Sequence, residues 1–320
     1  MEITGTLYAD AKTAYEVTYT PDIVYAHRET GDLTLQVLTP AHPNWPQPHK
    51  PSIFDKLIEE GLIQPGPAPE PEKRRFPLIV DVPGSGWSGA EGYYHVPKMV
   101  ELARQGYVVA SIAYRGTFKD DVRFPAAVQD TLEALRFMRA HADDFLVDID
   151  RVALLGDSSG GHTVALAALA GDDPRFNIGE NLSERTDVKS CVIFYGPNDL
   201  TNLVADRIAE GKVLRPGEGE YPFESREIFQ NDYLKDPQGM LADASPINYI
   251  SADKKMPPFI FLNGDEDPII PLHQGDRFCR KVRECGGRAE FYKIIGGGHG
   301  TGCWTNEAMS LILQHLNATV

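Results

Sequence analysis

From Phe76 onward the sequence alternates short apolar runs with longer segments of helical periodicity, and this alternation constrains the fold most. Each run has the length of a buried strand, and each following segment carries apolar residues on one helical face. Strands that alternate with helices form a parallel sheet covered on both faces. The expected strands are 76–82, 107–114, 151–156, 190–196, 257–264 and 289–295, and the expected helices are 96–106, 124–142, 160–171, 273–285 and 306–316.

Three segments depart from the alternation. Residues 15–40 alternate apolar and polar side chains around a turn, which predicts antiparallel strands at one edge of the sheet. Residues 40–77 hold ten of the 24 prolines, so we expect a surface insertion with one short helix at 52–63. Residues 197–250 are polar and predict a helical lid or cap. The prediction is one α/β domain over 1–320 with these two insertions.

Charge and cysteine content narrow the range of partners. The formal net charge is −15, and an acidic surface repels nucleic-acid phosphates and anionic lipid. The four cysteines show neither metal-ligand spacing nor the density of a disulfide framework. No apolar run is long enough to span a bilayer, and the N-terminal residues lack the pattern of a signal peptide. We expect a cytoplasmic protein without nucleic-acid or membrane partners, and a homodimer stays open.

The segment Gly156-Asp157-Ser158-Ser159-Gly160 lies between an expected strand and an expected helix and matches G-x-S-x-G. A strained strand-to-helix elbow crowds the positions two before and two after its nucleophile, so both favour glycine. This spacing indicates Ser158 rather than Ser159 as the nucleophile. The backbone N–H of Ser159 can then stabilise an oxyanion. A phosphate-binding loop would need a lysine in G-x-x-x-x-G-K-[ST], which the sequence lacks.

The candidate base for Ser158 is His299, because a serine hydroxyl needs a base to take its proton. His299 follows the last expected strand in a glycine-rich loop, at the edge where parallel sheets hold their sites. His162 is one helical turn beyond Ser158 and is predicted to pack in the interior instead. The acid that orients the imidazole should also follow a strand. Its candidates are Asp265, Glu266, Asp267 and Asp199.

Small residues after strand 76–82 suggest a second part of the site. Pro83-Gly84-Ser85-Gly86-Trp87 is either an oxyanion loop, whose backbone N–H groups face a ligand, or a simple turn. Several aromatic or imidazole side chains fall in the neighbouring loops, where they either line an acyl pocket or serve the structure. These residues are Trp87, Tyr93, Tyr94, His95 and Phe118, and the predicted substrate contacts among them are Trp87, Tyr94 and His95.

These motifs together resemble the α/β-hydrolase superfamily. Within it they look like the esterase branch with an HGGGW-type oxyanion loop and a GDSAGGH-type elbow, which includes feruloyl and acetyl-xylan esterases and hormone-sensitive-lipase-like enzymes. The resemblance extends from about Phe76 to the C-terminus and includes the order nucleophile, acid, histidine. It implies Asp267 as the acid. It also implies the backbone of Ser85, Gly86 and Ser159 as oxyanion donors.

The chain departs from that pattern in the oxyanion loop. Pro83 stands where the family has histidine and cannot donate an N–H, and Ser85 replaces a middle glycine. The proline-rich segment 40–77 is a further departure. The shape of the loop, and with it the identity of the donors, is therefore left open.

The expected activity is hydrolysis of a small-molecule carboxylic ester through an acyl-enzyme, carried by Ser158, Asp267 and His299 without metal or organic cofactor. Within the class, we expect a hydroxycinnamoyl ester of the feruloyl or chlorogenate type. A serine peptidase or amidase of the same fold, similar to an acylaminoacyl-peptidase or a formamidase, is the first alternative. A non-catalytic binding protein on this fold is the second.

Overall fold

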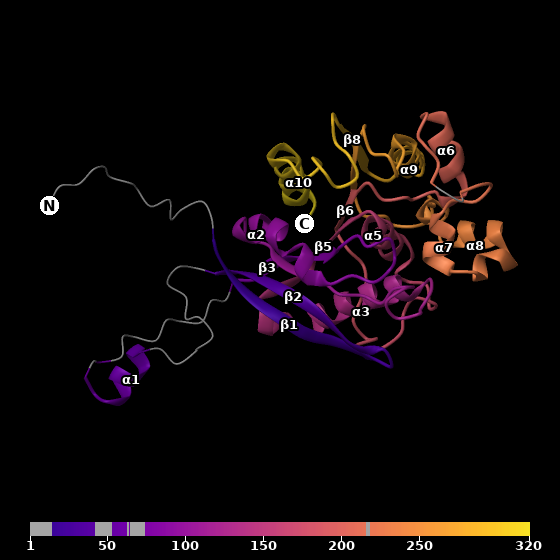
Figure 1. The fold of residues 1–320 in the computed structure, drawn as a ribbon. Coiled ribbons are helices and arrows are strands. Elements are labelled where there is room, and N and C mark those ends of the chain that lie inside the picture. The colour runs from indigo at the N-terminus through magenta and orange to yellow at the C-terminus, as the bar shows by residue number, and fades with distance from the viewer. Residues whose placement is uncertain (1–14, 42–52, 63, 65–73, 216–217) are drawn as a thin grey trace.

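The structure, a computed structural model, describes residues 15–41, 53–62, 64, 74–215 and 218–320. At its centre is one eight-stranded sheet of order β1-β2-β4-β3-β5-β6-β7-β8 (Figure 1). The strands are β1 Glu16–Arg28, β2 Gly31–Ala41, β3 Phe76–Val82, β4 Val108–Ile112, β5 Val147–Asp157, β6 Ser190–Phe194, β7 Phe259–Gly264 and β8 Ala289–Ile294.

Most of the sheet is parallel. Strands β3 to β8 pair in parallel, while β1 and β2 form an antiparallel hairpin that joins the sheet through β4. The predicted mostly parallel sheet with antiparallel N-terminal edge strands is thus confirmed. Because parallel strands end at the same edge, the loops that follow β3, β5, β7 and β8 lie at one edge of the sheet.

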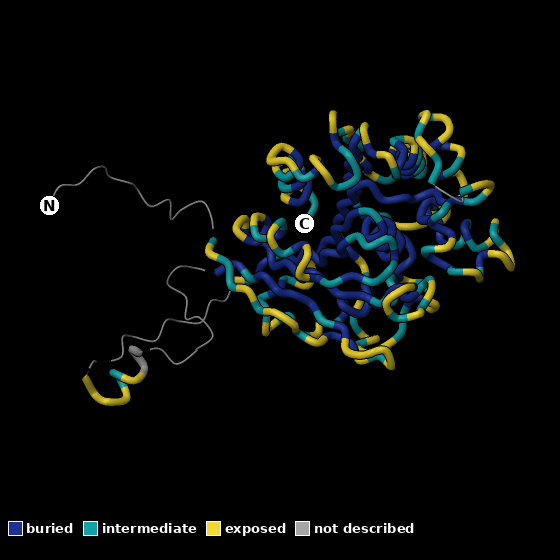
Figure 2. The backbone as a smooth tube through the Cα atoms, viewed as in Figure 1, coloured by how far each residue is buried: buried dark blue, intermediate teal, exposed yellow. Residues whose placement is uncertain are grey.

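Helices cover both faces of the sheet, as predicted for the α/β class. On one face lie α2 (Val96–Arg104) and α10 (Asn306–Thr319), and on the other lie α3 (Ala126–Ala140), α5 (Ser159–Ala170) and α9 (Leu272–Glu284). The strands alternate to match, since Leu78 and Val80 join one apolar cluster and Ile79 joins the other. Figure 2 shows the resulting buried centre. The short elements η1 (Gly92–Tyr94) and α4 (Ala142–Phe145) were not predicted.

Between β6 and β7 the chain forms the helical segment, residues 197–250. It consists of η2 (Leu200–Asn202), α6 (Leu203–Ala209), α7 (Glu224–Phe229), η3 (Asp232–Lys235), α8 (Pro237–Asp243) and η4 (Pro246–Tyr249). Apolar side chains of this segment, among them Leu203 and Phe229, form a small cluster with Trp87 of the loop after β3. The predicted helical character is confirmed, whereas a role as a lid stays a prediction.

Little of the proline-rich segment 40–77 lies within the described residues. The short helix expected there is present as α1 (Ile53–Glu59). The parts of the insertion at 42–52, 63 and 65–73 fall outside the described residues. Within the described parts of the chain, no helix is both long and apolar enough to cross a membrane.

Candidate active site

Ser158 stands at a strained turn between β5 and α5. Its backbone has φ 53° and ψ −124°, a conformation that is strained for every residue except glycine. A Cβ at Gly156 would lie 2.5 Å from the carbonyl oxygen of Gly160, and a Cβ at Gly160 would lie 1.9 Å from that of Val82. The two glycines are therefore needed where the chain crosses itself. The same crowding was the reason for centring the elbow on Ser158.

Three side chains from three loops form a continuous hydrogen-bonded series. Ser158 Oγ lies 2.8 Å from His299 Nε2, and His299 Nδ1 lies 2.9 Å from Asp267 Oδ2. His299 is partly exposed at 20% of its side chain, whereas Asp267 is fully buried. The order of contacts places a carboxylate behind the imidazole and the imidazole behind the hydroxyl, which is the geometry of a serine nucleophile with its base.

Asp267 is held in one orientation by its own loop. Its Oδ1 accepts hydrogen bonds from the backbone N–H groups of Ile269 and Ile270, at 2.7 and 2.9 Å. The other oxygen is then left to face His299. Lys212 of the helical segment donates to the backbone carbonyl of Asp267 at 2.6 Å, and this contact fixes the loop from outside.

The other carboxylates considered for this role point elsewhere. Asp265 Oδ1 accepts the N–H of Gly296, 2.7 Å away, and so braces the start of the loop that carries His299. Asp199 caps η2 and pairs with Arg277 at 2.8 Å. Glu266 is exposed. Among the four candidates, Asp267 is the one that contacts His299.

The loop after β3 departs from the predicted arrangement of oxyanion donors. The backbone N–H of Ser85 donates to Ser159 Oγ at 2.8 Å, and that of Gly84 donates to Asp157 Oδ1 at 2.6 Å. Ser85 is thus engaged within the protein rather than free for a ligand. Among the described residues, no acceptor contacts the N–H of Gly86. The N–H of Ser159 lies in the first turn of α5, where backbone donors lack intrahelical partners.

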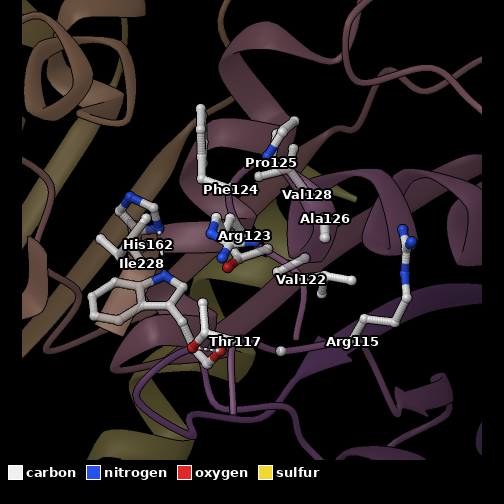
Figure 3. A pocket seen from close by; sticks show the side chains of 14 residues that line it. Arg115, Thr117, Val122, Arg123, Phe124, Pro125, Ala126, Val128, His162 and Ile228 are labelled. Atoms are coloured by element: carbon white, nitrogen blue, oxygen red, sulfur yellow. Dashed lines mark hydrogen bonds between the residues drawn. The ribbon is translucent and has the colours of Figure 1, made fainter. Parts of the chain in front are cut away.

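The three predicted substrate contacts lie in three different settings. Trp87 is buried and lines a small cavity beside the site, together with Thr117, Phe124 and Ile228 of neighbouring loops and α7 (Figure 3). Tyr94 is exposed at the surface and packs against Tyr93 at a tilt, with ring centroids 4.5 Å apart. His95 is buried beneath the loop after β3, between Asp81 and Asp157, so its ring does not line a substrate pocket.

The cavity beside Trp87 is small and does not reach the reacting groups. Its volume is about 20 Å³, room for about one water molecule, and neither Ser158 nor His299 lines it. Its lining is mostly apolar and includes Phe124, Val128 and Ile228 (Figure 3). Trp87 is therefore a packing residue in the wall of this cavity.

His162 packs in the interior, as the sequence predicts. Its Nδ1 accepts the indole N–H of Trp87 at 3.1 Å, and its Nε2–H donates to the carbonyl of Ala244 at 2.7 Å. One nitrogen accepts and the other donates, so the ring is neutral. Burial lowers the pKa of His162 to about 4. The ring ties the loop after β3 and α5 to the helical segment.

Sequence reasoning missed the residues that support the loop after β3. Asp157 Oδ2 accepts the hydroxyl of Tyr195 at 2.9 Å, and the ring of Tyr195 packs against His299 at 4.8 Å between centroids. Glu227 of α7 lies beside Gly86, where an added Cβ would be 3.4 Å from Glu227 Oε1. Burial raises the pKa of Glu227, and the nearby Arg215 opposes this. In the sequence, Asp157 of the Gly-Asp-Ser motif was the one feature that could have indicated these supporting contacts.

Comparisons with known proteins identify an esterase family. A family model described as BD-FAE matches residues 67–282. The chain is similar to esterase LipQ of Mycobacterium tuberculosis, with 30% identity over 71% of this chain and 50% of that protein. It is also similar to the probable carboxylic ester hydrolase LipM of the same organism, with 33% identity over 65% of this chain and 45% of that protein. The chain spans about half the length of these curated relatives.

Solved structures share the fold at low sequence identity. A truncated carbohydrate esterase from gut microbiota superposes with a TM-score of 0.71 at 22% identity, covering 96% of this chain and 97% of that chain. Esterase 2 of Thermogutta terrifontis gives a TM-score of 0.66 at 20% identity, covering 97% of this chain and 93% of that chain. The mostly parallel sheet with its crossover helices is thus the α/β-hydrolase fold.

Proposed function

Because this chain belongs to the BD-FAE family, an esterase family with the α/β-hydrolase fold, we propose that it is a serine carboxylesterase. The observation that carries the proposal is the contact series from Ser158 Oγ through His299 to the buried carboxylate of Asp267. The names of its relatives, which include esterases and carboxylic ester hydrolases, support the same activity.

In the proposed mechanism His299 acts first as base and then as acid. Its Nδ1–H donates to Asp267, so its Nε2 can accept the proton of Ser158 as Oγ attacks the ester carbonyl. The backbone N–H groups of Gly86 and Ser159 are the proposed donors to the oxyanion. The imidazolium then protonates the leaving alkoxide, which leaves an acyl group on Ser158. Water, activated by the same nitrogen, hydrolyses the acyl-enzyme and restores the serine.

Replacing the nucleophile tests this proposal. Ser158→Ala should lower kcat on p-nitrophenyl acetate by up to about 10⁶-fold, as removal of the serine does in such triads. Ser310 is an exposed serine on α10 and makes the matched control, so Ser310→Ala should keep the wild-type rate. Wild-type activity in the Ser158→Ala variant would refute the proposed function.

The acyl specificity is a finer proposal. A hydroxycinnamoyl ester remains the substrate predicted from the sequence, and the exposed aromatic rings of Tyr93 and Tyr94 are consistent with stacking on such a group. A second candidate is an ester with a short aliphatic acyl chain, because one relative, 23% identical over 54% of this chain, is named acetyl esterase. Values of kcat/KM for methyl ferulate, p-nitrophenyl acetate and p-nitrophenyl butyrate separate the two, since only the first requires an aromatic acyl site.

A peptidase or amidase would use the same three residues on a poorer leaving group. Matched p-nitrophenyl esters and p-nitroanilides of one acyl group distinguish these activities. We expect the ester to be hydrolysed far faster, and a comparable rate on the anilide would favour the amidase. A small-molecule ester as the partner and a cytoplasmic location stay predictions.

A further inference from the structure

The ring of His95 lies between two buried carboxylates beneath the loop after β3. His95 stands at the N-cap position of α2 without a side-chain capping hydrogen bond, and its Nδ1 lies 3.0 Å from Asp81 Oδ1 at the end of β3. Its Nε2 lies 3.3 Å from Asp157 Oδ1 at the end of β5. All three side chains are nearly inaccessible to solvent.

This arrangement is satisfied by a protonated ring between two ionised carboxylates. Each ring nitrogen faces a carboxylate oxygen, and an ionised carboxylate can only accept hydrogen bonds. A neutral imidazole has a single N–H, so its other nitrogen would place a lone pair against an oxygen lone pair. The imidazolium donates on both sides and supplies one positive charge between two negative ones.

Other charged and titratable groups lie around His95. Lys98 of α2 stacks on Trp304, whose ring meets that of His95 edge-on at 5.6 Å between centroids. Tyr195, at the end of β6, bonds to Asp157 from the opposite side. Burial opposes protonation of His95, but the carboxylates of Asp81 and Asp157 outweigh it and raise the pKa of the imidazole to about 10.

Asp157 connects His95 to the reacting groups. The oxygen of Asp157 that faces His95 also accepts the backbone N–H of Gly84 at 2.6 Å. The other oxygen accepts the hydroxyl of Tyr195, whose ring packs against His299. A shift of the Asp157 carboxylate would therefore move both the loop that carries Gly86 and the packing behind the base.

We propose that His95 is a positioning residue, which holds Asp157 so that Gly84 and the loop that carries Gly86 keep their place beside Ser158. It touches no reacting atom and acts through Asp157 alone. Asp81 holds the far side of the ring and is itself contacted by Ser111 Oγ at 2.5 Å. This proposal rests on the proposed serine esterase function.

Two substitutions of His95 test the contacts of its two ring nitrogens separately. In His95→Gln the amide can still reach Asp157, because the Gln amide nitrogen stands near the position of Nε2. In His95→Asn the amide nitrogen stands near Nδ1, reaches Asp81 and leaves Asp157 unsupported. A misplacement of about 1 Å costs on the order of 10²-fold in rate. We therefore expect His95→Asn to lower kcat about 100-fold and His95→Gln less than 10-fold, with KM nearly unchanged.

The measurements are kcat and KM for p-nitrophenyl acetate at pH 7.5, with circular dichroism to show that each variant is folded. His141 is a half-exposed histidine at the end of α3, outside the candidate site, so His141→Asn and His141→Gln are matched controls and should keep the wild-type kcat. Equal kcat values for the two folded His95 variants, or a change in thermal stability alone, would overturn the proposal.

Nitrogen NMR of the wild-type chain tests the proposal even if neither His95 variant folds. Both ring nitrogens of His95 should be protonated at pH 8, and a ring with one bare nitrogen would overturn the proposal. The Ser158→Ala variant keeps the two claims apart. If it is inactive while both His95 variants are fully active, the positioning role fails and the esterase proposal stands. If it is active, the proposed function itself fails.

Discussion

Asp267 shows how a single carboxylate is selected from several that lie at the same sheet edge. Two backbone N–H groups hold one of its oxygens, and His299 contacts the other. Asp265 instead braces the loop through Gly296. The sequence alone placed both aspartates after β7, and the preference for Asp267 came from the resemblance. Only the turn of the chain after Gly264 decides which carboxylate reaches the imidazole.

Exchange of these carboxylates for amides tests that assignment. Asp267→Asn should lower kcat by about 10⁴-fold, because the amide favours the wrong imidazole tautomer. Asp265→Asn is the matched control, since its remaining oxygen can still accept the N–H of Gly296, and we expect nearly wild-type kcat. Rates on p-nitrophenyl acetate are the measurement, and the reverse ranking would assign the acid to Asp265.

The elbow glycines permit a second prediction for single residues. A Cβ at Gly160 would meet the carbonyl oxygen of Val82, which belongs to the central sheet and cannot move away. Gly160→Ala should therefore lower the free energy of unfolding by about 1–3 kcal/mol or more. Gly219→Ala introduces a Cβ with nothing within 4 Å and should leave stability almost unchanged. Urea unfolding of both variants checks this, and equal stabilities would contradict the crowding at the elbow.

Among the elements, the helical segment is held to the acid loop by buried charges. Arg207 of α6 is fully buried, pairs with Glu218 and Glu224, and donates to the carbonyl of Ile269 at 2.9 Å. Lys212 bonds to the carbonyl of Asp267 in the same loop. On the other side of the site, the hydroxyl of Thr117 donates to the carbonyl of Glu227 in α7 at 2.6 Å. These contacts anchor the segment on both sides.

Removing Arg207 should be costly because Glu218 would remain buried without its ion-pair partner and Glu224 would keep only Arg215. We expect Arg207→Met to lower the free energy of unfolding by about 3–5 kcal/mol. The double variant Arg207→Met/Glu224→Met removes one of those charges as well and should be more stable than the single variant. Guanidinium unfolding measures both, and a double variant less stable than the single one would contradict this account of the cluster.

The longer elements could be predicted from sequence, but the short ones could not. Helices such as α3 carry several turns of apolar periodicity, and their predicted bounds agree with the structure within a few residues. The helices of the segment at 197–250 have at most seven residues, which is too short for a periodic pattern. Likewise, the hydrogen bond from His95 to Asp81 and its ion pair with Asp157 join separate elements of the fold, and no local sequence pattern indicates them.

For the whole molecule, two buried histidines should make the free energy of unfolding depend on pH in opposite directions. His162 should destabilise the fold at acidic pH, and the contribution of His95 should be lost at alkaline pH. The pKa of His162 is lowered from 6.5 to about 4, so the unfolded chain takes up this proton first as the pH falls. Its contribution, on the order of 3 kcal/mol, is present above pH 6.5 and is lost towards pH 4. The pKa of His95 is raised to about 10, so its contribution is full below pH 6.5 and is lost towards pH 10.

Unfolding free energies of the wild type, His162→Asn and His95→Gln between pH 4 and 10 check both signs. The His162→Asn variant should lose less stability than the wild type on going from pH 6.5 to 4. The His95→Gln variant should lose less on going from pH 6.5 to 10. Slopes that match the wild type on both limbs would contradict the assigned protonation states.

The central claim is that Ser158, activated by His299, is the nucleophile of an esterase. Covalent labelling with a fluorophosphonate, followed by mass mapping of the peptide that contains residues 154–163, tests it most directly. The account predicts one equivalent of label on Ser158 and a loss of esterase activity in proportion to the labelled fraction. Label on Ser159 or elsewhere, or full activity after the label has saturated Ser158, would contradict it.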